Sequence, residues 1–130
     1  MKYWKMEGAL PGKLNMGIGV FGRLFTLDPS GQVEPVKGSL SDLPASMWSR
    51  YEVCSSSAAA DIWFAFDNQA DVDAKVQFIQ NEGLAGAFVV SMDLDDFDGN
   101  SCTDINDLHG PFAVTDRVHA QLNPPVQSNG

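Results

Sequence analysis

The sequence predicts an α/β protein, because an amphipathic helix lies between two segments that have the pattern of β-strands. The first segment, Ile62–Phe66, is short and aromatic, and the second, Leu84–Met92, is almost continuously apolar. Between them, Val72, Val76 and Ile79 recur at a spacing that places them on one face of a helix. A nearly continuous apolar strand after such a helix usually lies in a parallel sheet that is covered on both faces. We therefore expect these segments to form a βαβ unit.

Length, composition and charge limit the classes of function. The chain has 130 residues, 44% hydrophobic and 19% charged, which suits one core-forming domain and excludes wholesale disorder. Its longest apolar run, Leu84–Val90, is too short for a membrane-spanning helix. The net charge of −9 repels phosphate backbones and anionic lipids over most of the surface. Neither nucleic acid nor a membrane is expected as a partner.

The amino-terminal part of the chain is predicted to contain a short helix and a long strand. Trp4–Leu10 has the features of a helix tail, and Lys13–Leu27 those of a strand with extended flanks. That strand contains three glycines, Gly17, Gly19 and Gly22. Glycine at this density suggests tight packing or the close approach of a ligand to the backbone. Asp28–Ala60 is rich in turn-forming residues and is expected to be irregular, apart from an ordered segment at Met47–Val53.

Two predicted helices lie in the second half of the chain. Asn68 is placed to cap the central helix, Asp71 lies in its first turn, and Gly83 follows its end. Pro111–Leu122 predicts a further helix, which the following pair of prolines ends.

The sequence predicts no cofactor and no metal. A G-x-G-x-x-G pattern at Gly17–Gly22 falls inside the predicted strand rather than between a strand and a helix. The acidic run Asp93–Gly99 has leucine where a calcium loop needs its first carboxylate, and no glutamate occupies the twelfth position. His109 and His119 have no cysteine or second histidine pair nearby, so neither zinc nor a catalytic triad is expected.

Cys54 and Cys102 leave two interpretations open. They are too few for a disulfide scaffold and lack C-x-x-C spacing, so they form either one bridge or two inert thiols. The first residues contain no apolar stretch resembling a secretory signal, which predicts a chain that stays in the compartment where it is made.

Four segments match known sequence motifs, in one order along the chain. Lys13–Leu27 is similar to K-L-x-x-G-I-P-x-Y-G-R-S-F-T-L, and Tyr51–Cys54 is similar to Y-E-x-C. Ile62–Asp67 is similar to W-V-x-Y-D, and Gly86–Phe97, followed by Cys102, is similar to a barrel strand that ends in an acidic run. Together these segments resemble the family 18 glycoside hydrolases, the chitinases and chitinase-like lectins.

The resemblance implies that the chain corresponds to about the last quarter of a (β/α)8 TIM barrel. Its fold would be the last two strand–helix units of that barrel, interrupted by a shortened α+β chitinase insertion. Residues 1–27 would contain the end of helix 6 and strand 7, residues 28–70 the insertion, and residues 71–130 helix 7, strand 8, helix 8 and the tail. Such a piece has open sheet edges, which promote association.

The resemblance also implies roles for residues of the insertion. Cys54 and Cys102 match positions that pair to join the insertion to the barrel, which implies a secreted parent protein. Met47 falls where several relatives present an apolar side chain to the cleft, and core packing is the alternative role. Trp48 and Trp63 are expected in the core of the insertion rather than in a sugar platform.

Three residues correspond to sugar-contacting positions on strands seven and eight, and a fourth, Phe88, lies two residues before one of them. Arg23 matches an arginine that reaches a sugar hydroxyl or carbonyl, and a structural ion pair is the alternative. Phe21 stands where the family usually has tyrosine, so the ring is kept without its hydroxyl. Val90 occupies the position of a tryptophan that stacks on a pyranose, a loss that would weaken binding about a hundredfold. Phe88, on the same face, either replaces part of that surface or fills the barrel core.

The resemblance does not extend to the catalytic segment. The family's D-x-x-D-x-D-x-E segment lies on the fourth strand, and no such spacing exists in this sequence. In the family that glutamate protonates the glycosidic oxygen, while a preceding aspartate orients the substrate's N-acetyl group as nucleophile. Because a general acid contributes about 100- to 10,000-fold to the rate, we predict no glycosidase activity from this chain alone.

The sequence leaves three functions open. The first is the C-terminal part of a secreted chitinase or chitinase-like protein, with the rest of the barrel as its partner. The second is a non-catalytic, lectin-like product that binds chitin or chitooligosaccharides weakly. The third is an acidic extracellular matrix or interaction protein in which the sugar site has decayed.

Overall fold

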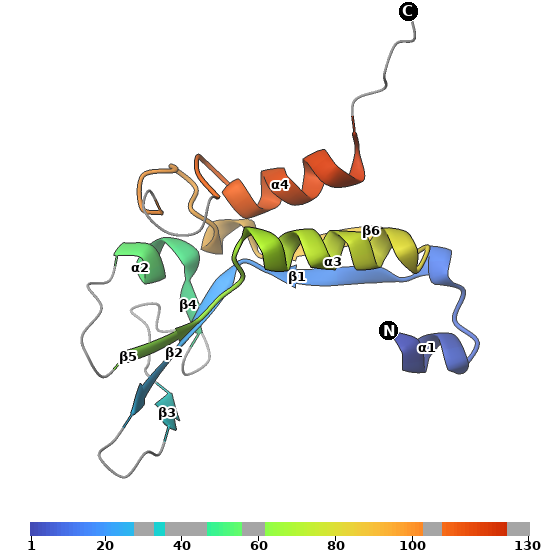
Figure 1. Ribbon diagram of the computed structural model, residues 1–130, viewed down its shortest axis with the longest axis horizontal. Helices are drawn as coiled ribbons and strands as arrows, with labels where there is room; N and C mark the ends of the chain where they lie inside the picture. Colours follow the sequence, from blue (N-terminus) through green and yellow to red (C-terminus); the bar gives the residue numbers. More distant parts are fainter. Residues whose placement is uncertain (28–32, 36–46, 56–61, 103–107, 125–130) are drawn as a thin grey trace, which may run out of the picture.

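The computed structural model describes residues 1–27, 33–35, 47–55, 62–102 and 108–124, which form two sheets flanked by helices (Figure 1). In chain order the elements are α1 (Lys2–Met6), η1 (Pro11–Lys13), β1 (Asn15–Gly19), β2 (Phe21–Leu27), β3 (Val33–Pro35), β4 (Met47–Ser49), α2 (Arg50–Ser55), β5 (Ile62–Ala65), α3 (Gln69–Asn81), β6 (Gly86–Val90), η2 (Met92–Leu94) and α4 (Ala113–Leu122). Much of the predicted irregular region, at 28–32, 36–46 and 56–60, lies outside the described residues. Among the described residues, no helix has the length and apolarity needed to cross a bilayer.

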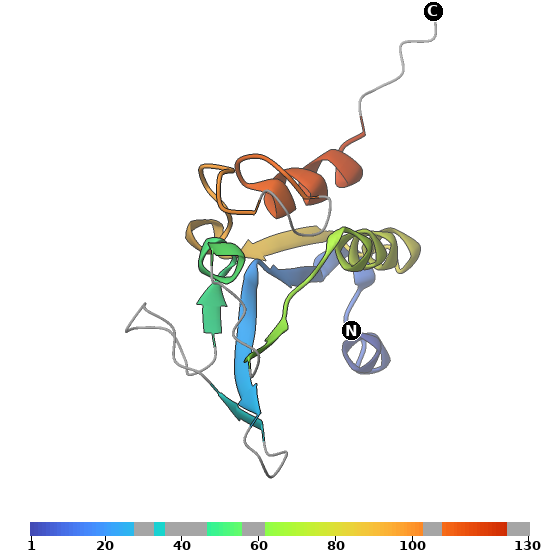
Figure 2. The same cartoon turned by 60° about the vertical axis from the view of Figure 1, so that its left-hand side comes forward.

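The two sheets differ in strand direction. β1 and β6 form a parallel pair in which Asn15 lies opposite Gly86 and Gly19 lies opposite Val90. The second sheet is antiparallel, and β2 is its centre because it pairs with β3, β4 and β5. Figure 2 shows β2 turning away from the parallel sheet, with β5 beside it. The two adjacent parallel strands that the resemblance implies are therefore present.

The long strand predicted at Lys13–Leu27 is divided at Val20. β1 ends at Gly19 and β2 begins at Phe21, and the two strands belong to different sheets. The N–H of Val20, a buried residue, donates to the carbonyl oxygen of Val90 (3.1 Å), beyond which β6 ends. The prediction of one strand is wrong because an extended apolar pattern does not reveal where the pairing partner changes.

The predicted βαβ unit also has the wrong first strand. β5 pairs antiparallel with β2, with Trp63 opposite Phe25 and Ala65 opposite Arg23. The parallel partner of β6 is β1, which precedes β6 by about 70 residues along the chain. A strand and the helix that follows it do not specify which distant strand completes the sheet, so the sequence did not reveal β1 as the partner of β6.

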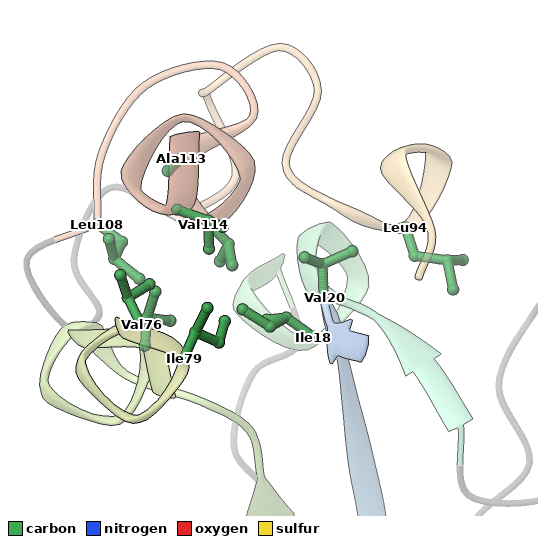
Figure 3. Packing of buried hydrophobic residues seen from close by; sticks show 10 residues of the cluster. Ile18, Val20, Val76, Ile79, Leu94, Leu108, Ala113 and Val114 are labelled. Carbon is green, nitrogen blue, oxygen red and sulfur yellow. The ribbon is translucent and has the colours of Figure 1, made fainter. Parts of the chain in front are cut away.

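One hydrophobic core lies between the parallel sheet and the helices α3 and α4 (Figure 3). Its buried members are Ile18, Val20, Val72, Val76, Ile79, Leu94, Leu108, Ala113, Val114 and Val118. The predicted apolar face of α3 is confirmed. The other face of β6 carries Phe88 and Val90, whose exposed fractions are 53% and 41%. The prediction of a strand covered on both faces is therefore wrong, because the helices cover one face only.

The helix boundaries agree closely with the sequence. Asn68 accepts from the N–H of Asp71 (2.9 Å) and Asp71 accepts from the N–H of Asn68 (3.1 Å), which is the capping box of α3. The helix α4 begins at Ala113, two residues after the predicted start at Pro111, and ends at Leu122 as expected. The first helix, α1, ends at Met6 and is shorter than predicted.

A charged pair links the two long helices. Arg117 of α4 donates to both carboxylate oxygens of Asp73 of α3, each at 2.8 Å. The hydrogen bonds from the guanidinium hold the pKa of Asp73 below its usual value, and they raise the pKa of Arg117. Both side chains are more than one-third exposed, so the pair orients the helices more than it stabilises them.

Replacing Ile79 with alanine is expected to lower the free energy of unfolding by about 2 to 5 kcal/mol, because it leaves a cavity where α3 meets the sheet. Chemical denaturation followed by circular dichroism measures the change. The control Met6→Ala removes an exposed side chain and should change the free energy of unfolding by less than about 0.5 kcal/mol. Equal losses in the two variants would contradict the assigned core.

Candidate functional site

The carboxyl ends of β1 and β6 lie side by side, because the strands are parallel and Gly19 is opposite Val90. In α/β folds this edge of the sheet is where ligand-binding residues gather. Beyond it, the chain continues from β1 into the antiparallel sheet and from β6 into η2. Four of the predicted site residues, Phe21, Arg23, Phe88 and Val90, lie at or near this edge.

Phe88 and Val90 share the uncovered face of β6. Their neighbours Ala87 and Val89 point to the other face and pack against the core, as strand alternation requires. The ring of Phe88 lies over Gly17, where an added Cβ atom would come within 2.9 Å of the ring. The predicted close packing of glycine is therefore confirmed at Gly17, and the Phe88 side chain is exposed in this chain.

Phe21 and Arg23 form the start of β2. They are two residues apart on a strand, so their side chains share one face of the antiparallel sheet. The guanidinium carbon of Arg23 lies 5.8 Å from the centre of the Phe21 ring, within range of a cation–π contact. The Phe21 ring itself covers Gly19, where an added Cβ atom would come within 2.8 Å. The structure thus brings these two predicted residues together.

Met47 lies directly opposite Arg23, because β4 pairs with β2 in that register. Residues directly opposite in an antiparallel pair project from the same face. Met47 is half-buried, which leaves room for both roles that the sequence suggested for it, packing and contact with a ligand. The predicted site residues therefore fall into two groups. Phe88 and Val90 lie on the parallel sheet, whereas Phe21, Arg23 and Met47 lie on the antiparallel sheet.

An open cleft of about 460 Å³ extends from Phe21 and Arg23 across β5. Its lining residues are Gly19, Phe21, Arg23, Trp63, Phe64, Ala65, Phe66, Asp67 and Lys75. Lys75 of α3 forms an ion pair with Asp67, which follows β5, so one cation and one carboxylate lie at the end of the cleft. The volume is within the range of small-molecule sites, roughly 300 to 1,000 Å³.

Trp63 was not among the predicted site residues, and the prediction of a core position for it is wrong. Its side chain is 57% exposed and its ring centre lies 6.0 Å from that of Phe25. Trp48, opposite Gly22, is half-buried. The alternation in Ile62–Ala65 shows that Trp63 and Phe64 face opposite sides, but it does not reveal which side is covered.

A buried charged cluster lies where α2 meets the segment that follows η2. Arg50, which is 3% exposed, has its Nε atom 3.9 Å from the carboxylate of the fully buried Asp95. Asp95 also accepts from the N–H (3.1 Å) and the hydroxyl (2.9 Å) of Thr115, which places its charge in the first turn of α4. Burial lowers the pKa of Arg50, while Asp95 and Asp96 oppose that change.

Two carboxylates of the acidic run are buried rather than solvated. Asp95 accepts from the N–H of Thr115 in the first turn of α4, and both Asp95 and Asp96 are buried. Asp96 accepts from the N–H groups of Ser101 (3.2 Å) and Cys102 (2.9 Å). Nothing in the residue pattern distinguished these two buried carboxylates from the exposed ones beside them.

Cys54 and Cys102 form a disulfide, which confirms the pairing that the resemblance implied. Cys54 belongs to α2, at the end of the antiparallel sheet, and Cys102 follows the acidic run after β6. The bond therefore connects the segment that carries β4 to the segment that follows the parallel sheet. Together with the ion pair between Arg50 and Asp95, it joins the two groups of predicted site residues.

A family model and two individual relatives indicate the same family for this chain. Residues 1–95 match the family model described as glycosyl hydrolases family 18. Chitinase-3-like protein 2 of Homo sapiens is 28% identical over 145 aligned residues, which cover 92% of this chain and 35% of that protein. Chitotriosidase-1 of Mus musculus is 29% identical, with 96% and 30% covered.

Solved structures agree with the sequence comparison. Human YKL-39, described as a pseudo-chitinase with retained chitooligosaccharide binding properties, superimposes with a TM-score of 0.76 at 26% identity. That match covers 94% of this chain and 38% of that structure. A Group IV chitinase of Ostrinia furnacalis gives a TM-score of 0.72 at 25% identity. The chain spans about a third of the length of these relatives.

Removing the disulfide is expected to lower the free energy of unfolding by about 4 kcal/mol, because the bond closes a loop between cysteines 48 residues apart. The double variant Cys54→Ser, Cys102→Ser and the oxidised chain should be compared by guanidinium denaturation. A mass increase of two hydrogens on reduction would verify the bond in the starting material. Identical denaturation midpoints would contradict a stabilising role for the disulfide.

Proposed function

Because the chain belongs to family 18 of the glycosyl hydrolases, we propose that it supplies the strand-seven and strand-eight side of a chitooligosaccharide site and does not hydrolyse sugar by itself. On this proposal it is the C-terminal barrel part of a secreted chitinase or chitinase-like protein. Residues 1–27 and 71–130 are the barrel segments, and residues 28–70 are the shortened insertion.

The observation that carries the proposal is the alignment of Gly19 with Val90 at the ends of two parallel strands. This alignment sets the exposed face of Phe88 and Val90 beside the start of β2, with Phe21 and Arg23. Apolar ring surface with a few polar groups is the usual composition of a sugar or small-molecule site. The likeness to YKL-39, with its chitooligosaccharide binding, supports the same ligand class for this chain.

Binding is proposed to be weak. Val90 offers an aliphatic surface where the resemblance places an indole, and Phe21 lacks the hydroxyl of tyrosine. The ring of Phe88 is exposed and supplies part of the missing apolar surface. Arg23 is the proposed donor to a sugar hydroxyl or carbonyl, and Met47, opposite it, is the proposed apolar neighbour.

We propose that the chain does not hydrolyse sugar, because the carboxylates of its cleft and of its buried cluster are not placed to act as the catalytic acid. The sequence contains no D-x-x-D-x-D-x-E spacing. Asp95 and Asp96 are buried and hydrogen-bonded to backbone and hydroxyl groups, and Asp93 accepts from the hydroxyl of Ser91. A general acid must reach the glycosidic oxygen within hydrogen-bond distance, which the buried Asp95 and Asp96 cannot do. Asp67, the carboxylate that lines the cleft, is paired with Lys75.

The rest of a barrel is the proposed macromolecular partner. Within the described part of the chain, the parallel sheet has two strands, so each strand has one edge without a neighbouring strand. Unpaired parallel edges beside an exposed apolar face favour the addition of further strands. The disulfide supports an oxidising compartment for such a protein, which agrees with the proposal of secretion.

The variant Val90→Trp tests the proposed binding. It should tighten the Kd for an N-acetylglucosamine tetramer by about tenfold to a hundredfold, because it adds an aromatic surface to the exposed face of β6. Isothermal titration calorimetry of the 130-residue chain measures the Kd. Leu10→Trp is the control, since it adds an indole at an exposed position between α1 and η1. No binding by the original chain at millimolar sugar would refute the proposal.

A separate measurement tests the absence of hydrolysis. Incubation of the oxidised chain with chitin or the tetramer should release no reducing ends above the buffer blank, because the sequence has no segment that supplies the acid. The assay follows reducing ends over a day at several protein concentrations. Release that increases in proportion to protein would show that hydrolysis does occur.

A further inference from the structure

We propose that Trp63 is an aromatic platform on which a pyranose ring stacks, so that the sugar chain extends from the ends of β1 and β6 onto the antiparallel sheet. The inference rests on the proposed chitooligosaccharide function and names an additional contact in the same cleft. The motif that contains Trp63 predicted a position in the core of the insertion, not a contact with sugar.

The register of β2 with β5 sets the direction of the Trp63 side chain. Trp63 lies opposite Phe25, and Ala65 lies opposite Arg23. Opposite residues in an antiparallel pair share a face, so the indole projects from the same face as the guanidinium of Arg23. On the other face, Leu24 is fully buried and Gly22 approaches Val53 of α2. Because that face is covered, the indole lies on the open face of the sheet.

The surroundings of Trp63 suit a sugar. The indole is 57% exposed, and Ala65, two residues along β5, presents only a small side chain on the same face. The same cleft is lined by Arg23, Asp67 and Lys75, which supply donors and acceptors for hydroxyl and N-acetyl groups. A flat aromatic surface with a few polar groups at its edge gives both stacking and orientation.

The exposed aromatic surface on β6 is less suited to this role. The ring of Phe88 lies against Gly17, so part of its surface is already covered, and Val90 has no ring. Trp63 carries a larger aromatic system, and Phe25 supports it from one side at 6.0 Å between ring centres. We therefore assign the main stacking contact to β5 rather than to β6.

Alanine substitution provides the first test. Trp63→Ala should raise the Kd for an N-acetylglucosamine tetramer about tenfold to a hundredfold, because it removes most of an aromatic contact surface. Trp63→Phe keeps a smaller ring and should lose roughly threefold, which also guards against a folding defect in the alanine variant. Trp4→Ala is the matched control, since Trp4 is 58% exposed and belongs to α1. Its Kd should stay within about twofold.

Fluorescence provides an independent readout. The sequence contains three tryptophans, so the variant Trp4→Phe, Trp48→Phe leaves Trp63 as its only indole. Addition of the tetramer should shift the emission to shorter wavelength and saturate at the Kd measured by calorimetry, because stacking removes water from the ring.

The outcomes separate this inference from the proposed function. Binding by the original chain that is unchanged in Trp63→Ala would overturn the role of Trp63 and leave the proposed function standing. Calorimetric binding by the single-tryptophan variant without an emission change would likewise overturn the role of Trp63 and leave the proposed function standing. If the original chain does not bind the tetramer at all, both proposals are wrong.

Discussion

The parallel pairing of β1 with β6 is the contact on which the other features of the molecule depend. It joins segments about 70 residues apart and aligns Gly19 with Val90. In this register Ile18 and Val89 point toward the helices, while Gly17 and Phe88 point to the uncovered face. Because side chains alternate along a strand, a slip of one residue would exchange the two faces. The core and the candidate site would both be lost.

A second constraint keeps the antiparallel sheet beside those strand ends. The disulfide between Cys54 and Cys102 and the ion pair between Arg50 and Asp95 connect the two parts of the chain. Arg50 is costly to bury, and its Nε and Nη2 atoms have no hydrogen-bond partner among the residues that the structure describes. Such a charge is tolerated where nearby carboxylates are also buried.

Family membership explains the scaffold but leaves the chemistry to particular residues. The strand that resembles the family's last barrel strand is present, yet its exposed face carries Val90 and Phe88. The first strand of the antiparallel sheet keeps an aromatic residue and an arginine at Phe21 and Arg23, in contact with one another. On the proposed function, affinity for sugar would depend on how much aromatic surface the antiparallel sheet contributes.

Residue patterns alone were enough to predict the long helices and the family. Asn68 and Asp71 predicted the start of α3, and the apolar spacing predicted the face that it buries, because caps and helical periodicity depend on residues a few positions apart. The disulfide followed from the resemblance, since two cysteines alone left free thiols as an alternative. Three features became evident from the structure and not from the sequence. β5 pairs with β2, the chain passes from one sheet to the other at Val20, and Trp63 is exposed. Strand partners and covered faces are set by contacts between segments far apart in the chain, and local residue patterns do not encode them.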